Sequence, residues 1–257
     1  YMTTTSSIHT FHIPVMGLSF TIDSPIRVAQ YGISSVVSIV DDELIEKMSA
    51  FYSQKFSLPY QEITKKFHDY RAERIKSYLN LMDRIVGEKF EAFKLELSES
   101  RLALDRFLGM LPNQSDFKKG LLELLENGNQ LGQSVRDFLE RHFSPGAIDV
   151  NIMTKVDRDT YDKNELLPPD FSDAHTALRG FAMSRLQSSV VFSAGMNPRL
   201  YSSLESFGCF FPDSDGRLEK KIVLKVSDYR SALIQGNFLA KKGLWVSEYR
   251  IESGLNC

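Results

Sequence analysis

The sequence predicts an α/β protein built on a parallel sheet. Six short apolar segments alternate along the chain with helical segments, and five of the six are followed by a helix. Consecutive strands that are joined through a helix run parallel, because a tight turn can join only antiparallel neighbours. Two architectures fit this order, a doubly wound open sheet and a (β/α) barrel, and the spacing of the segments does not separate them.

The first third of the chain predicts two strand–helix pairs. A strand-like segment at 12–17 is followed by Asp23-Ser24-Pro25, a capping residue ahead of a proline at the start of a helix. Residues 33–40 are rich in valine and isoleucine, which is typical of a strand buried on both faces. Asp41 and Asp42 then read as capping residues of the next helix, where negative charge is favourable.

The middle of the chain, residues 61–143, predicts a long helical insertion. Apolar residues recur there at helical spacing among lysines, arginines and glutamates, with breaks at Pro112 and Gly128. We interpret the charged positions as a solvated face, with a partner-binding surface as the alternative. The expected organisation is therefore 1–60 as two βα units, 61–143 as the insertion, and 144–257 as the remaining βα units of the same domain.

The last third predicts four more strands with helices between them. The helices are expected to begin at Ser172, Asn197 and Ser227, each of which reads as a capping residue. The strands are expected at 147–156, 188–193, 220–226 and 245–251.

Composition excludes several classes of protein. The chain has 257 residues, and its 31 basic against 33 acidic side chains argue against nucleic-acid binding, which needs a concentrated positive field. Its apolar runs are far shorter than the roughly 20 residues of a membrane-spanning helix. Two cysteines, Cys209 and Cys257, fit a reducing compartment, and no secretory signal opens the chain, so a cytoplasmic location is expected. Tyr1 ahead of Met2 indicates a segment of a longer protein.

Candidate functional residues lie where the predicted strands end, since ligands bind at the carboxyl ends of parallel strands. Lys225 interrupts an apolar strand near its end and must face solvent or meet a negative group, such as a ligand. Asn151 lies inside an apolar strand, where its amide must serve a ligand or a neighbouring backbone. The five histidines form no metal-ligand spacing, so no metal is expected. No G-x-G-x-x-G, H-E-x-x-H, G-x-S-x-G or C-x-x-C motif occurs.

Several of these segments resemble the nitronate monooxygenase (2-nitropropane dioxygenase-like) family of FMN-binding TIM barrels. Pro14-Val15-Met16-Gly17 resembles the family's Ala-Pro-Met turn, and Asp149-Val150-Asn151-Ile152 its Val-Asn-Leu strand. Residues 188–195 resemble its Val-Val-Ser-Phe segment, and 251–257 the run that leads into its Gly-Gly-His. The resemblance implies an FMN-binding TIM barrel. It further implies cofactor contacts from Val15, Met16, Gly17, Asn151 and Lys225, with Ser193 and Asn256 facing the substrate.

The resemblance also implies what lies outside these residues. The family's histidine is expected beyond Cys257, together with the last two strands, whose loops hold the FMN phosphate, so the barrel is expected to be incomplete at its C-terminus. This segment alone is then expected to bind FMN weakly and to show no turnover. The expected function is a flavin (FMN)-dependent oxidoreductase resembling nitronate monooxygenase or a flavin-dependent enoyl reductase, acting on a small molecule. The alternative is a non-catalytic scaffold in which 61–143 docks a partner protein or a second copy.

Overall fold

A computed structural model describes residues 8–16, 21–39, 41–126, 131–155, 157–193 and 195–252. The chain divides into two compact units, each made of two segments. Unit 1 comprises residues 1–36 and 82–148, and unit 2 comprises residues 37–81 and 149–257. Each unit is described by itself below.

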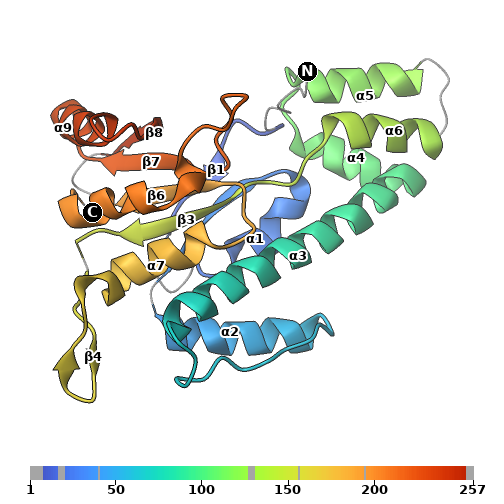
Figure 1. Ribbon diagram of the computed structural model, residues 1–257. Coiled ribbons are helices and arrows are strands. Elements are labelled where there is room, and N and C mark those ends of the chain that lie inside the picture. The colour runs from blue at the N-terminus through green and yellow to red at the C-terminus, as the bar shows by residue number, and fades with distance from the viewer. Residues whose placement is uncertain are drawn as a thin grey trace. The chain divides into compact units, whose positions relative to one another are not determined.

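Six strands form one sheet in the order β1-β2-β3-β6-β7-β8 (Figure 1). The hydrogen-bonded neighbours run parallel at β1–β2, β3–β6, β6–β7 and β7–β8. The β2–β3 bonds advance in the same direction on both strands, from Ser35 N–H to Ala147 C=O and from Ile39 N–H to Asn151 C=O, so this pair is parallel too. All six predicted strands are confirmed: β1 His12–Ile13, β2 Ser34–Ser38, β3 Ile148–Met153, β6 Ser189–Ser193, β7 Lys221–Val226 and β8 Val246–Ile251.

The strand order decides between the two predicted architectures. Each strand of the main sheet is added beside the one before it, in chain order and on the same side. In a doubly wound sheet the later strands would instead be added on the other side of the first strand. The structure is therefore an α/β half-barrel with a curled parallel sheet, as the expectation of an incomplete barrel requires.

In unit 2, the helices that follow the strands cover one face of the sheet. The Phe192 ring of β6 packs on Tyr201 with ring centroids 5.1 Å apart, and the Tyr249 hydroxyl of β8 lies against Gly236. A short antiparallel hairpin, β4 Tyr161–Asp162 with β5 Glu165–Leu166, was not predicted. The helices of this unit are α2 Asp42–Lys55, α7 Asp173–Ala182, α8 Pro198–Ser203, α9 Tyr229–Ala240 and the start of α3 Tyr70–Glu99.

Among the predicted helix caps, Asp41 and Asn197 make the expected bond, Asp23 and Ser172 hold the N-cap position without it, and Ser227 is wrong. The Asp41 carboxylate accepts from Leu44 N–H, and Asn197 caps α8 in the same way. The prediction that Ser227 caps α9 is wrong, because Asp228 accepts from Ser231 N–H instead. Ser172 occupies the N-cap position of α7 but makes no side-chain cap bond, since its hydroxyl bonds to a histidine.

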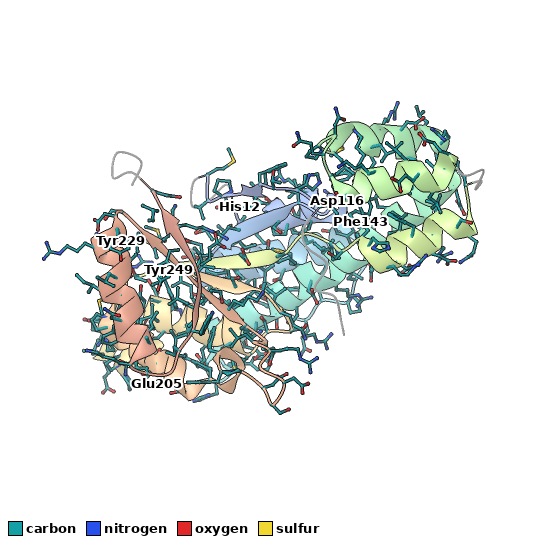
Figure 2. All side chains as sticks on the ribbon, turned by 90° about the horizontal axis from the view of Figure 1, so that it is seen from above. His12, Asp116, Phe143, Glu205, Tyr229 and Tyr249 are labelled. Carbon is teal, nitrogen blue, oxygen red and sulfur yellow. The ribbon has the colours of Figure 1, made fainter. Side chains whose placement is uncertain are left out.

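Unit 1 is held together by a mainly helical core. Its helices are α1 Ser24–Val28, the 3₁₀ turn Ala29–Tyr31, the rest of α3, α4 Arg101–Met110, α5 Asp116–Glu126 and α6 Gln133–His142. Within the predicted range 61–143, the described helices begin at Tyr70 and end at His142. Phe143 is central to the core (Figure 2), with its ring 4.8 Å from that of Phe90, 5.2 Å from Phe107 and 5.6 Å from Phe117. Such tilted aromatic pairs stabilise a core beyond their burial alone.

Candidate functional site

Three predicted site residues lie on one face of the sheet in unit 2. Paired residues of parallel strands point to the same face, and faces alternate along a strand. Asn151 pairs with Val191, two positions before Ser193. Val191 pairs with Val223, two positions before Lys225, and Lys225 pairs with Arg250. Asn151, Ser193, Lys225 and Arg250 therefore share the face opposite the helices, which we call the concave face.

Asn151 carries an unsatisfied polar atom at the centre of the concave face. Its side chain is buried and its Nδ2 donates to Ser38 Oγ at 3.3 Å. Its Oδ1 is also buried, yet no described residue donates to it. A buried amide oxygen without a donor costs free energy, so this atom is a candidate acceptor for a ligand's N–H or O–H group.

Lys225 meets a negative group, one of the two outcomes that its position in an apolar strand requires. Its Nζ lies 2.8 Å from Glu252 Oε2, and both side chains are partly exposed. A negatively charged ligand would therefore compete with Glu252 for the ammonium group. Ser193 is buried, and its backbone carbonyl accepts both the N–H (3.0 Å) and the hydroxyl (2.8 Å) of Thr154.

An ion pair that the sequence did not indicate spans the concave face. Arg250 Nη2 lies 3.4 Å from Asp149 Oδ2, and its Nε donates to Glu248 at 2.6 Å. Ser189 N–H donates to the other Asp149 oxygen at 3.0 Å. Burial raises the pKa of Asp149, although the Ser189 N–H and the Arg250 charge both act to lower it. The face thus carries charged and amide groups beside the buried side chains of Val191 and Val223.

A second polar cluster lies where β3 and β6 end. Asp157 Oδ1 accepts from Ala174 N–H at 3.0 Å, and Oδ2 accepts from Asn197 Nδ2 at 3.1 Å. His175 Nδ1 lies 2.8 Å from Ser172 Oγ and 3.6 Å from Asp157 Oδ2. Burial is the main cause that lowers the pKa of His175, with Asp157 opposing it.

This cluster is not a hydrolase triad, despite its Ser, His and Asp. Both Ser172 and Asp157 approach the same ring nitrogen of His175, whereas nucleophilic catalysis needs them on opposite nitrogens. The other nitrogen, Nε2, is buried, and none of the described residues forms a hydrogen bond of ordinary geometry with it, although the Arg199 backbone is near enough to affect the pKa. We therefore interpret the cluster as a clamp that joins the ends of two strands to α7 and α8.

The remaining predicted contacts lie elsewhere. Val15 and Met16 belong to unit 1, and the Met16 side chain is 75% exposed. Gly17 and Asn256 lie outside the described residues.

At the carboxyl edge of the sheet, Gly195 has φ +107°, and a Cβ there would lie 2.6 Å from Lys155 Cε. The positive φ favours glycine at this position, whereas the flexible Lys155 side chain could move aside.

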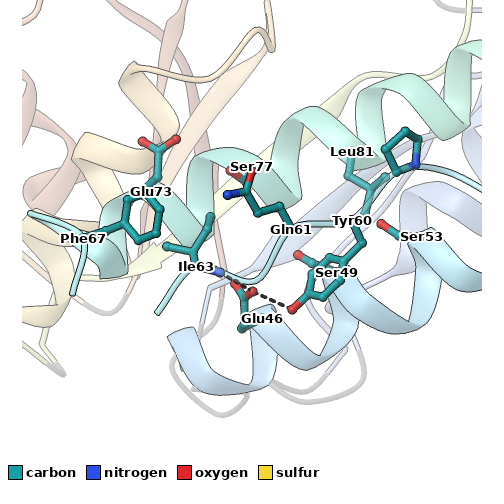
Figure 3. A pocket seen from close by; sticks show the side chains of 11 residues that line it. Glu46, Ser49, Ser53, Tyr60, Gln61, Ile63, Phe67, Glu73, Ser77 and Leu81 are labelled. Atoms are coloured by element: carbon teal, nitrogen blue, oxygen red, sulfur yellow. Dashed lines mark hydrogen bonds between the residues drawn. The ribbon is translucent and has the colours of Figure 1, made fainter. Parts of the chain in front are cut away.

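A cavity of about 320 Å³ in unit 2 lies between α2, the loop at 59–67 and the start of α3 (Figure 3). Its most connected group is Glu46, whose Oε1 accepts from Tyr60 OH at 2.7 Å and from Ile63 N–H at 2.9 Å. Arg74 Nε lies 3.6 Å from Glu46 Oε2 and donates to Ile63 C=O at 2.8 Å. These bonds anchor the loop, so we interpret this side of the cavity as structural.

Asp42, predicted as a helix cap, serves an arginine network instead. It accepts from Arg71 Nε at 2.9 Å and from Arg74 Nη1 at 2.8 Å. Arg71 also binds Asp173, Thr160 Oγ1 and the carbonyl of Phe171. The network ties α2 and the start of α3 to α7. Its arginines are already paired with carboxylates, so we do not assign them to a ligand.

Across the residues that the structure describes, no group of His, Cys, Asp and Glu side chains could hold a metal ion. Within the same residues, every helix is too short or too polar to cross a membrane. The fold and the contacts define a class, an α/β half-barrel with a polar concave face. No protein-family model, curated protein or solved structure that was compared with the chain matches it.

Proposed function

We propose that the concave face binds the ring of FMN and that the protein is a flavin-dependent oxidoreductase. The observation that carries this proposal is the buried Asn151 Oδ1, which lacks a donor. The isoalloxazine ring presents a ring N–H between two carbonyl oxygens, so it supplies the donor that this amide needs. Lys225 supports the same assignment, because it lies on the same face and a cation stabilises negative charge on a reduced flavin ring.

The residues of the chain have distinct tasks in this function. Asn151 accepts a hydrogen bond and fixes the orientation of the ring, while Ser38 holds its Nδ2. Lys225 supplies positive charge, which Glu252 keeps in place at 2.8 Å until the ligand arrives. Ser193 presents its hydroxyl beside the ring to the small-molecule substrate. FMN, when bound, supplies the redox chemistry itself.

The test is a titration of the purified protein with FMN and with riboflavin, following the quenching of flavin fluorescence. Because the proposed contacts are to the ring, we expect both flavins to bind weakly and with dissociation constants within several-fold of each other. The Asn151→Ala variant should weaken both by about tenfold, the usual worth of one buried hydrogen bond. Lys221→Met, a change at the start of the same strand as Lys225, serves as the control. Absence of saturable binding by either flavin would refute the proposal.

The alternative function, a non-catalytic interaction protein, has one observation in its favour. Three large apolar side chains of α3 and α4, Leu95, Leu102 and Met110, are 42%, 61% and 49% exposed. If these residues bind a second copy, sedimentation coefficients should rise with concentration. The Leu102→Gln variant should then abolish that rise. A colourless protein that also takes up no flavin would favour this second function.

A further inference from the structure

Unit 1 contains a groove of about 620 Å³ that the proposed flavin-binding function does not use. It lies between the 3₁₀ turn that follows α1, the middle of α3, and α4. All of its lining residues belong to unit 1, so its geometry does not depend on unit 2. Its volume falls within the range of small-molecule sites.

The floor of the groove is aromatic. The Phe93 ring meets Tyr31 edge-on at 5.0 Å and Phe107 edge-on at 5.3 Å. Ala92 and Ala103 also line the groove, and their small side chains leave space above these rings. Such a floor binds a planar apolar group by stacking or edge contacts.

Three polar side chains around the floor have a polar atom or a charge that none of the described residues pairs with. The Oε1 of Gln30 is buried, and none of the described residues donates to it. Glu96 and Arg106 line the groove from α3 and α4, and among the described residues neither forms an ion pair. The fourth polar residue of the lining, Lys89, already donates to the carbonyl of Ile26.

We propose that this groove binds a free aromatic α-amino acid. The ring would lie on Phe93 and Phe107, the carboxylate would pair with Arg106, and the ammonium group would donate to Glu96 and to Gln30 Oε1. An aromatic acid without the ammonium would meet Glu96 unpaired, and an aromatic amine without the carboxylate would leave Arg106 unused. Only a ligand with both charges matches the opposite charges of the lining.

The experiment uses three indole ligands that differ by one charged group each: L-tryptophan, tryptamine and indole-3-propionate. Binding is measured by calorimetry or saturation-transfer NMR, because the exposed Trp245 would complicate fluorescence. We expect L-tryptophan to bind at least tenfold more tightly than either analogue, since each lacks one charge-assisted contact.

Two neutralising variants assign the contacts. Arg106→Gln should weaken L-tryptophan and indole-3-propionate by about tenfold and leave tryptamine unchanged. Glu96→Gln should weaken L-tryptophan and tryptamine and leave indole-3-propionate unchanged. The control is Arg101→Gln on the same helix, whose guanidinium is already paired with Asp105 outside the groove.

A variant that fills the groove, Ala103→Trp, should abolish binding of all three ligands while circular dichroism stays that of the parent protein. If it fails to fold, Gln30→Leu, which removes only the acceptor, is expected to weaken L-tryptophan and tryptamine. Equal affinity for the three ligands, or unchanged affinity in both charge variants, would overturn the proposal. So would the absence of L-tryptophan binding.

Discussion

Arg250 and Asp149 form an ion pair, Nη2 to Oδ2 at 3.4 Å, although their strands are three places apart in the sheet. Neighbouring strands are about 4.8 Å apart, so β3 and β8 would be separated by about 14 Å in a flat sheet. Side chains stand roughly perpendicular to a sheet, and an arginine and an aspartate cannot bridge that distance side by side. The pair therefore forms because the strands of unit 2 curl toward the concave face.

The first prediction concerns this pair. Replacing Arg250 by Met leaves Asp149 buried without its counter-charge, and we expect a loss of about 3 kcal/mol in the free energy of unfolding. Asp149→Asn removes the charge itself and keeps an acceptor for Ser189 N–H, so it should cost less than about 1 kcal/mol. Urea denaturation at neutral pH measures both.

The pH dependence provides a check on the same pair. The pKa of Asp149 is raised, so the folded protein binds this proton more tightly than the unfolded chain does. Its contribution to stability is therefore present below the ordinary pKa of 3.8 and is lost as pH rises through the folded pKa. Asp149→Asn should abolish this loss. Equal destabilisation by the two substitutions would show that the charge of Asp149 does not matter.

Local patterns were enough to single out Asn151 and Lys225, which the register of the sheet places on the concave face. Strands alternate between faces, and the lysine in 220–226 and the asparagine in 147–156 stand out against apolar neighbours. The sequence could not indicate that Arg250 belongs with them, because 245–251 mixes polar and apolar residues with no apolar run in which an arginine would stand out. Its partner is a hundred residues away in the chain, and the two meet only through the curl of the sheet.

The helix caps show the same limit, namely that local sequence does not reveal partners from other elements. Asp41 and Asp42 both fit the start of a helix, but Asp41 holds the N-cap position, and the carboxylate of Asp42, the first residue of α2, accepts from Arg71 and Arg74. These arginines come from a different helix, so no local pattern could reveal them. Gln30 Oε1 is likewise buried by tertiary packing in unit 1, which the residues around Gln30 in the sequence do not indicate.

The second prediction uses two glycines in unit 1. A Cβ on Gly146 would collide with the backbone carbonyl of Ile33, and because the Cβ is fixed to its own backbone neither group can turn aside. We expect Gly146→Ala to destabilise the protein by about 3 kcal/mol. Gly87 is the matched control, since it lies inside α3 with no atom within 4 Å of an added Cβ. Gly87→Ala should stabilise by up to about 1 kcal/mol in thermal or urea unfolding.

The third prediction concerns Tyr60 at the cavity beside α2. Burial, followed by the hydrogen bond to Glu46, raises the pKa of Tyr60 to about 12. The phenol therefore remains a donor to the Glu46 carboxylate across the physiological range. Glu46→Gln should move the pKa of Tyr60 back toward 10.0, which NMR of labelled tyrosine ring carbons can follow.

Stability provides an independent measurement of the same bond. Tyr60→Phe should cost about 1 kcal/mol or less, because the hydrogen bond has a charged acceptor but the tyrosine is partly exposed to solvent. The exposed Tyr161, on the β4 hairpin, offers a control in which Tyr→Phe changes nothing. An unchanged pKa of Tyr60 in the Glu46→Gln variant would mean that burial alone holds it high.

The last prediction is a loss of stability in mild acid that depends on His175. Burial lowers the pKa of this histidine below 6.5, so its folded form binds a proton less readily than the unfolded chain. A neutral His175 thus contributes stability above pH 6.5 that is lost as pH falls toward the folded pKa. We expect the free energy of unfolding to fall between pH 7 and pH 5 by up to about 1.4 kcal/mol per pH unit from this one group. His175→Asn, which can still accept from the Ser172 hydroxyl, should flatten that slope, whereas His68→Asn at an exposed position should retain it. Parallel stability curves for the parent protein and His175→Asn would show that protonation of the clamp at the ends of β3 and β6 does not limit the acid stability of the fold.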